Sequence, residues 1–168
     1  MSIASDEALY RAFVGPRNQD YYLAYFARAD ARGYAPISWH WPVLAVGLLW
    51  FIYRKLYLLA FVTFVFPYLA SILGALAERF VAGSGAPLAW ILVLGFYAVW
   101  LPLHANAYYY RQARTAIEAT RVALPGRPED QAALVAARGG VHLQLPMIML
   151  TLLVLLMVLS GSIGQLRG

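Results

Sequence analysis

The sequence of 168 residues contains no cysteine and few charged residues. Without cysteine the chain can form no disulfide, no thiolate metal site and no cysteine nucleophile. Aspartate, glutamate, lysine and arginine together make up 12% of the residues, whereas hydrophobic residues make up 62%. Soluble domains are typically about 25% charged and about 45–50% apolar. This deficit of charge is typical of a membrane protein.

Motifs that would indicate an enzyme or a nucleic-acid-binding protein are also missing. The sequence has no nucleotide-binding loop, no Gly-x-Ser-x-Gly nucleophile elbow and no HExxH metal motif. Its net charge of +5 comes from thirteen basic residues that are spread along the chain. A nucleic-acid-binding surface would need them clustered. We therefore expect a non-catalytic protein that binds no nucleic acid.

Three long apolar stretches predict an all-α integral membrane protein with about three transmembrane helices. Residues 56–77 supply twenty-two uncharged residues, which form about 33 Å of helix against a hydrocarbon thickness of about 30 Å. The second stretch runs from residue 87 to about residue 103, and the third covers residues 141–163. Pro67 lies near the middle of the first stretch, where it is expected to kink the helix.

A shorter apolar segment, residues 42–53, precedes the first span, and two placements are open for it. Its helix would be only about 18 Å long, which is too short to cross comfortably. We interpret it as an interfacial or re-entrant helix that begins at Pro42, where a missing amide proton costs nothing. A full span that begins near Ile37 is the alternative.

The polar stretches 1–36 and 107–140 predict short cytoplasmic helices. In each of them a glycine beside a proline, at residues 15–16 and 125–126, predicts a break between two helices. The chain is thus divided into amphipathic helices in 1–36, an interfacial or re-entrant helix in 37–55, a two-span hairpin in 56–106, a helical arm in 107–140, and a last span with a short tail in 141–168.

Arginine and lysine predict the orientation. With three spans, residues 1–55 carry six basic residues and residues 104–140 carry five on the same side of the membrane, whereas the turn carries only Arg79 and the tail only Arg167. Cytoplasmic segments are enriched in basic residues, so the N-terminus and the arm are predicted to be cytoplasmic and the C-terminus outside. A fourth span over residues 37–53 would move the N-terminal arginines outside, which this rule disfavours.

Several short motifs resemble a known family. They are Phe13-Val14-Gly15, Tyr21-Tyr22-Leu23 with Phe26, Ser38-Trp39 with Trp41, Leu49-Trp50-Phe51, Tyr53-Arg54-Lys55-Leu56-Tyr57, Ala105-Asn106 with Tyr109-Tyr110-Arg111, and Gly139-Gly140. Together they resemble a bacterial membrane protein family known as domain of unknown function 2628. The sequence departs from that family at Leu48, which follows Gly47 where the family commonly has proline. The resemblance implies a bacterial inner-membrane location and brings no activity, substrate or cofactor.

Two aromatic and basic patches are candidate contacts with lipid or with a partner protein. The first comprises Trp39, Trp41, Trp50, Tyr53, Arg54, Lys55 and Tyr57, and the second comprises Asn106, Tyr109, Tyr110 and Arg111. Tryptophan and tyrosine concentrate at membrane interfaces, and tyrosine and arginine are enriched in interaction hot spots. Arg54 and Lys55 are interpreted as an anchor that sets the topology or as a contact with anionic headgroups. An aromatic belt at the membrane surface is the alternative for the second patch.

The three histidines, His40, His104 and His142, allow a haem or metal hypothesis, because all three are predicted near the cytoplasmic interface. The alternative is that an interfacial histidine, with an apolar ring and a polar tip, needs no ligand there. We expect no cofactor.

The absence of catalytic motifs and the abundance of interfacial aromatics favour a non-catalytic accessory or scaffold subunit of a larger membrane protein complex. A component of an oligomeric channel or transporter and a lipid-interacting membrane regulator are the alternatives. The expected partners are membrane lipids and other membrane protein subunits.

Overall fold

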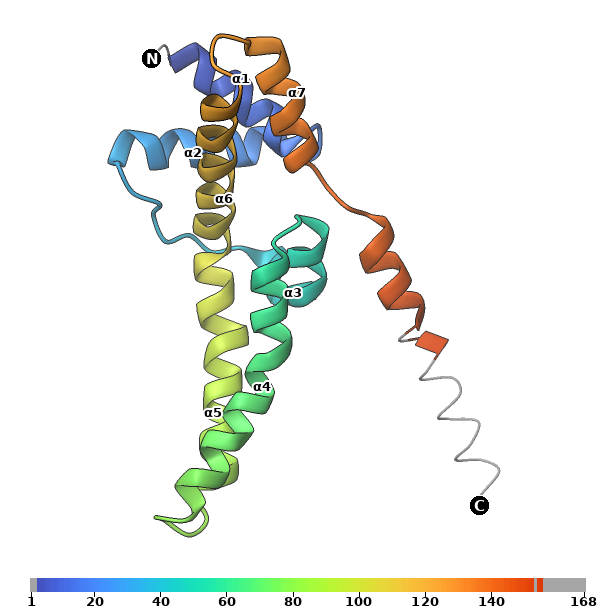
Figure 1. The fold of residues 1–168 in the computed structure, drawn as a ribbon. Coiled ribbons are helices and arrows are strands. Elements are labelled where there is room, and N and C mark those ends of the chain that lie inside the picture. The colour runs from blue at the N-terminus through green and yellow to red at the C-terminus, as the bar shows by residue number, and fades with distance from the viewer. Residues whose placement is uncertain (1–2, 153, 156–168) are drawn as a thin grey trace.

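A computed structural model describes residues 3–152 and 154–155, and the regular elements in this part of the chain are all helices (Figure 1). They are α1 Ile3–Val14, α2 Gln19–Arg32, α3 Trp41–Tyr53, α4 Tyr57–Glu78, α5 Gly85–Leu94, the π-helix η1 Gly95–Trp100, α6 Leu101–Ala123 and α7 Pro128–Arg138. Residues 144–152 are also helical. The predicted all-helical fold is therefore confirmed for the described residues.

The chain forms a long hairpin and a compact head (Figure 1). We call α4, α5 and η1 the hairpin, and α1, α2, α6 and α7 the head. Two helices, Tyr57–Glu78 and Gly85–Ala123, are long and apolar enough to cross a membrane. The third predicted span, residues 141–163, lies partly outside the described residues. In the described part of that segment, the large apolar side chains from Leu143 to Leu155 are mostly exposed.

A single helix of 39 residues, Gly85–Ala123, joins the hairpin to the head. It changes its hydrogen-bonding pattern at η1, where the amide of Leu101 donates to the carbonyl of Phe96, five residues earlier. The physical reason is Pro102, which has no amide proton and cannot continue the ordinary α-helical pattern. The helix nevertheless continues without a break, so the head and the hairpin share one rigid axis.

The core of the head is built from aromatic side chains around Tyr109 of α6. The ring of Tyr109 lies 5.5 Å from that of Phe13 on α1, and 4.9 Å and 5.8 Å from the rings of Tyr22 and Phe26 on α2. All four side chains are 2% exposed or less. Burying each such ring stabilises the fold by roughly 1.5–3 kcal/mol, so this cluster holds α1 and α2 against α6.

The short helix α3 is bent where its two halves meet. Gly47 has φ 32° and ψ −104°, which interrupts the helix and which a residue with a side chain rarely adopts. The bend directly precedes Leu48, the position that distinguishes this chain from the family it resembles. Residues 35–40 are not helical, so no helix begins at Ile37, and the interfacial or re-entrant placement of residues 37–55 stays a prediction. The predicted short helix starting at Pro42 agrees with the observed α3, which begins one residue earlier.

Candidate functional site

Arg54 occupies the junction between α3, the head and the start of the hairpin. Its side chain is almost completely buried, with 1% of the residue exposed. Nη1 donates hydrogen bonds to the carbonyl oxygen of Val14 at 3.1 Å and to the hydroxyl oxygen of Tyr109 at 3.2 Å, while Nη2 donates to the carbonyl oxygen of Arg17 at 3.1 Å. These bonds reach the last residue of α1, the turn that follows it, and the middle of α6.

The Arg54 guanidinium is stabilised by aromatic rings and by the C-terminal end of α1 rather than by a carboxylate. The guanidinium carbon lies 4.5 Å from the centre of the Tyr22 ring and 5.1 Å from that of Tyr109. Both contacts are within the range of a cation–π interaction. The C-terminal carbonyls of α1 also carry partial negative charge. The interpretation of Arg54 as a headgroup contact is therefore wrong, because the side chain is buried inside the head.

His40 lies beside this cluster and caps α3. Its Nδ1 accepts a hydrogen bond from the amide of Val43 at 3.3 Å, so the neutral ring carries its proton on Nε2 and donates it to the Tyr22 hydroxyl at 3.2 Å. Burial, together with the smaller effect of the positive charge of Arg54, lowers the pKa of His40 to about 4. His40 is consequently a neutral structural histidine at physiological pH.

The other two histidines lie in different surroundings. His104 donates from Nδ1 to the carbonyl oxygen of Trp100 at 2.8 Å, and Nδ1 of His142 lies 3.1 Å from the hydroxyl of Tyr57. Within residues 3–152 and 154–155, no group of three or more histidine, aspartate or glutamate side chains is arranged to hold a metal ion. The structure thus does not assemble the three histidines into a common site.

The second predicted patch is mostly interior. Asn106, Tyr109 and Tyr110 are buried, and only Arg111 is exposed. The amide nitrogen of Asn106 donates to the hydroxyl of Tyr21 at 2.7 Å and to that of Ser38 at 2.8 Å. A contact role for the three buried residues is therefore corrected to a packing role, since each faces the head rather than its surroundings.

The residues of the first patch are divided between the core and the surface. Trp50 is 6% exposed and packs on the ring of His40, with 4.5 Å between the ring centres. Trp41 and Trp39 are 69% and 38% exposed and contact each other at 5.4 Å. Tyr57 is 49% exposed, while Tyr53 and Lys55 are partly buried. The exposed members remain available as contacts.

A groove in the head, not predicted from the sequence, lies between α1, α2 and α6. It has a volume of about 690 Å³, and its floor includes the small residues Ala24 and Ala27 of α2. Its polar edge contains Asp30, which accepts a hydrogen bond from the hydroxyl of Tyr10 at 3.2 Å and pairs with Arg114 at 3.5 Å. The groove therefore combines a small-residue floor with fixed charges at its edge.

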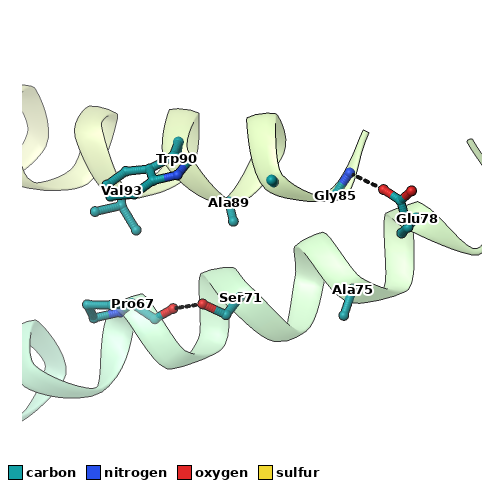
Figure 2. A pocket seen from close by; sticks show the side chains of 9 residues that line it. Pro67, Ser71, Ala75, Glu78, Gly85, Ala89, Trp90 and Val93 are labelled. Carbon is teal, nitrogen blue, oxygen red and sulfur yellow. Dashed lines mark hydrogen bonds between the residues drawn. The ribbon is translucent and has the colours of Figure 1, made fainter. Parts of the chain in front are cut away.

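The hairpin has a second groove, which Figure 2 shows between α4 and α5. The helices approach most closely at Gly74 and Gly85, because a Cβ atom on Gly85 would lie only 2.8 Å from the carbonyl oxygen of Gly74. Glu78 closes this end by accepting hydrogen bonds from the amides of Gly83 and Gly85, both at 2.7 Å. Toward Pro67 the helices leave an apolar groove of about 510 Å³.

The sequence matches no protein-family model, no curated protein and no solved structure. The resemblance to domain of unknown function 2628 therefore stays a prediction. Function has to be argued from the arrangement of the residues alone.

Proposed function

We propose that this chain is a non-catalytic accessory or scaffold subunit of a larger bacterial membrane protein complex. The hairpin anchors it in the inner membrane, and the head presents a docking surface in the cytoplasm. The observation that carries the proposal is the uninterrupted helix Gly85–Ala123, which belongs to the apolar hairpin at one end and to the centre of the head at the other.

The exposed surface of the hairpin supports the anchoring role. Large apolar side chains such as Leu58, Phe61, Trp90 and Ile91 are each more than 60% exposed. Surfaces of this kind are unfavourable in water and mark membrane or protein contacts. Insertion of the hairpin into lipid removes this apolar area from water without any further folding.

The head supports the docking role, because its position is fixed relative to the hairpin. Arg54 bonds to α1 and α6, and the backbone amides of Ser38 and His40 donate to the carbonyls of Leu103 and Pro102 at 3.2 Å and 3.0 Å. A rigid head of this kind can hold a partner at a set height above the membrane. Preorganisation lowers the entropic cost of binding.

The groove over Ala24 and Ala27 is the proposed docking surface of the head. Small side chains allow a partner helix to approach closely, and the fixed charges of Asp30 and Arg114 can set its register. An oligomeric channel is less well supported, because the groove between α4 and α5 is lined mainly by apolar atoms and its one ionisable lining residue, Glu78, is held by backbone amides at the end of the groove. Ion pathways usually carry ionisable groups within the membrane.

Native mass spectrometry of the full chain, released from its own membranes in mild detergent, tests the proposal. We expect a defined stoichiometric complex with a second protein. Ala27→Trp, at an exposed position on the groove floor, should abolish that complex, whereas Ala133→Trp on the exposed face of α7 should leave it intact. A lone stable monomer in native membranes, or equal effects of the two variants, would reject the proposal.

A further inference from the structure

An unbroken series of aromatic contacts follows one face of the long helix. Phe66 of α4 stacks on Phe96 at 3.9 Å, Phe96 on Trp100 at 5.3 Å, and Trp100 on His104 at 5.0 Å. Residues four apart share one face of a helix, so these rings form a line that leads from the hairpin into the head.

The line ends in a polar and cationic group at the start of the head. The ring of Tyr108 lies 5.7 Å from that of Trp100, and the guanidinium carbon of Arg111 lies 5.9 Å from the centre of the Tyr108 ring. Side chains on a helix point toward its N-terminus. Arg111 therefore extends back toward the hairpin, where the apolar part of the helix ends.

An apolar groove of about 520 Å³ accompanies the aromatic end of this line. It runs along the long helix beside Gly95, Val99 and Leu103, and His104 stands at its upper end. The floor is open at Gly95, because a Cβ atom built there would meet nothing within 4 Å. This shape can accept a flexible apolar chain that lies parallel to the helix.

The positive charge of Arg111 lies farther along the long helix than His104, the residue at the upper end of the groove. Within the described part of the chain no hydrogen bond or ion pair joins Arg111 to a carboxylate, whereas the nearby acids Asp30 and Glu118 both pair with Arg114.

We infer that this face binds one anionic phospholipid, with an acyl chain in the groove over Gly95 and the phosphate at Arg111. His104 lines the groove below the phosphate, and because its Nδ1 donates to the carbonyl of Trp100, Nε2 of the neutral ring can only accept a hydrogen bond. Along the helix axis, Gly95 and His104 are about 14 Å apart and His104 and Arg111 about 10 Å apart. An arginine guanidinium is well suited to a phosphate group. The inference rests on the proposed insertion of the hairpin and specifies the lipid that its surface selects.

Quenching of Trp100 fluorescence measures this binding directly. The full chain is reconstituted in phosphatidylcholine vesicles. These contain increasing fractions of a lipid with brominated acyl chains, which is phosphatidylglycerol in one series and phosphatidylcholine in the other. The contribution of Trp100 is obtained by subtracting the signal of the Trp100→Phe variant. We expect brominated phosphatidylglycerol to quench Trp100 at a lower fraction than brominated phosphatidylcholine. Equal quenching by the two lipids would overturn the inference.

Two substitutions with matched controls separate the headgroup from the acyl chain. Arg111→Gln should weaken the phosphatidylglycerol preference about fivefold, which corresponds to about 1 kcal/mol for one basic residue near lipid. The control, Arg127→Gln, removes an exposed charge in the turn before α7 and should leave the preference unchanged. Gly95→Leu should reduce quenching by filling the groove, and Ala75→Leu, which fills the other groove, should not. A preference that survives Arg111→Gln would equally overturn the inference.

Flotation of the vesicles separates this inference from the proposed function. Protein that fails to float with the vesicles contradicts the membrane anchoring itself. Protein that floats with the vesicles but shows no lipid preference contradicts only the phospholipid site.

Discussion

Arg54 donates a hydrogen bond to the carbonyl oxygen of Val14, which lies 40 positions earlier in the chain and 3.1 Å away. The bond joins the end of α3 to the end of α1. Because α4 begins only three residues after Arg54, at Tyr57, the same side chain also fixes where the hairpin leaves the head. This guanidinium therefore connects the end of α3 to α1, to the turn after it and to α6 of the head.

Arg54→Met should destabilise the head by roughly 2–3 kcal/mol, because hydrogen bonds to charged groups contribute about 1.5–3 kcal/mol and the loss is partly offset by removing a buried charge. Arg54→Lys should recover less than half of this loss, since an ammonium cannot reproduce the fork of three bonds. Thermal unfolding in detergent, followed by tryptophan fluorescence, measures both. Arg127→Met, at an exposed arginine, should change little, and full recovery by lysine would show that only the charge matters.

Stability should fall in mild acid because of His40. Its pKa is about 4 in the folded protein and 6.5 is the ordinary value, so the unfolded chain binds the proton more readily. The stabilisation is complete above pH 6.5 and is lost as the pH falls toward 4, to a total of about 3 kcal/mol. Denaturation midpoints measured across this interval should show a shallower pH dependence in His40→Gln, whereas His142→Gln should retain the parent slope. An unchanged slope in His40→Gln would contradict the buried neutral imidazole.

The helical segments were predictable because their signals are local. Proline at the first turn and glycine after the last define α7, Pro128–Arg138, and the long apolar runs define α4 and α5. Length alone predicted that residues 42–53 form a short separate helix, whereas its bend at Gly47 was not predicted. The π-helix η1 was not predicted, although Pro102 supplies a signal for it one turn away.

The site was much less predictable, because its contacts join distant positions. Arg54 meets Tyr109 across 55 positions and Asn106 meets Tyr21 across 85. A segment in which an arginine lies among tyrosines and tryptophans looks the same in sequence whether it forms a membrane-interface belt or part of a protein core. Only the folding of α1 and α2 against α6 distinguishes the two, and no local pattern encodes it. Arg111 alone among the second patch was placed correctly on the surface.

Alanine at Gly74 and alanine at Gly95 should have opposite effects. In the middle of a helix alanine is favoured over glycine by about 1 kcal/mol, and Gly95 has open space for the extra methyl group. At Gly74 the methyl group would overlap with the carbonyl of Gly85, so α4 and α5 must separate and lose close packing. Comparing the unfolding of the two variants in the same detergent should show Gly95→Ala at or above the parent and Gly74→Ala below it. Equal stabilities would mean that the helices do not touch at Gly74.

Lys55→Gly should stabilise the protein by less than about 1 kcal/mol. Lys55 has φ 60° just after the end of α3. Its amide donates to the carbonyl oxygen of Ile52, and the amide of Leu56 donates to the carbonyl oxygen of Phe51. This pattern favours glycine, because a side chain in the left-handed region costs roughly 1–2 kcal/mol. The loss of the exposed hydrogen bond from Nζ to the carbonyl of Ala137 at 3.1 Å offsets part of the gain. Lys55→Gln, which keeps the strain, is the control, and the two variants are compared by chemical denaturation.

Single cysteines should report the same side of the membrane for α2 and for the turn before α7. The natural sequence has no cysteine, so Arg28→Cys, Arg127→Cys and Ala82→Cys each introduce one thiol without background. In the proposed topology the bent α3 returns to the side it came from, which places Arg28 and Arg127 together in the cytoplasm and Ala82 outside. A membrane-impermeant thiol reagent applied to intact cells should then label only Ala82→Cys, whereas inverted vesicles should expose the other two. Labelling of Arg28→Cys from outside would show that α3 crosses the membrane. That topology would place the N-terminal helices and the arm on opposite sides of the membrane, although the structure packs them against each other.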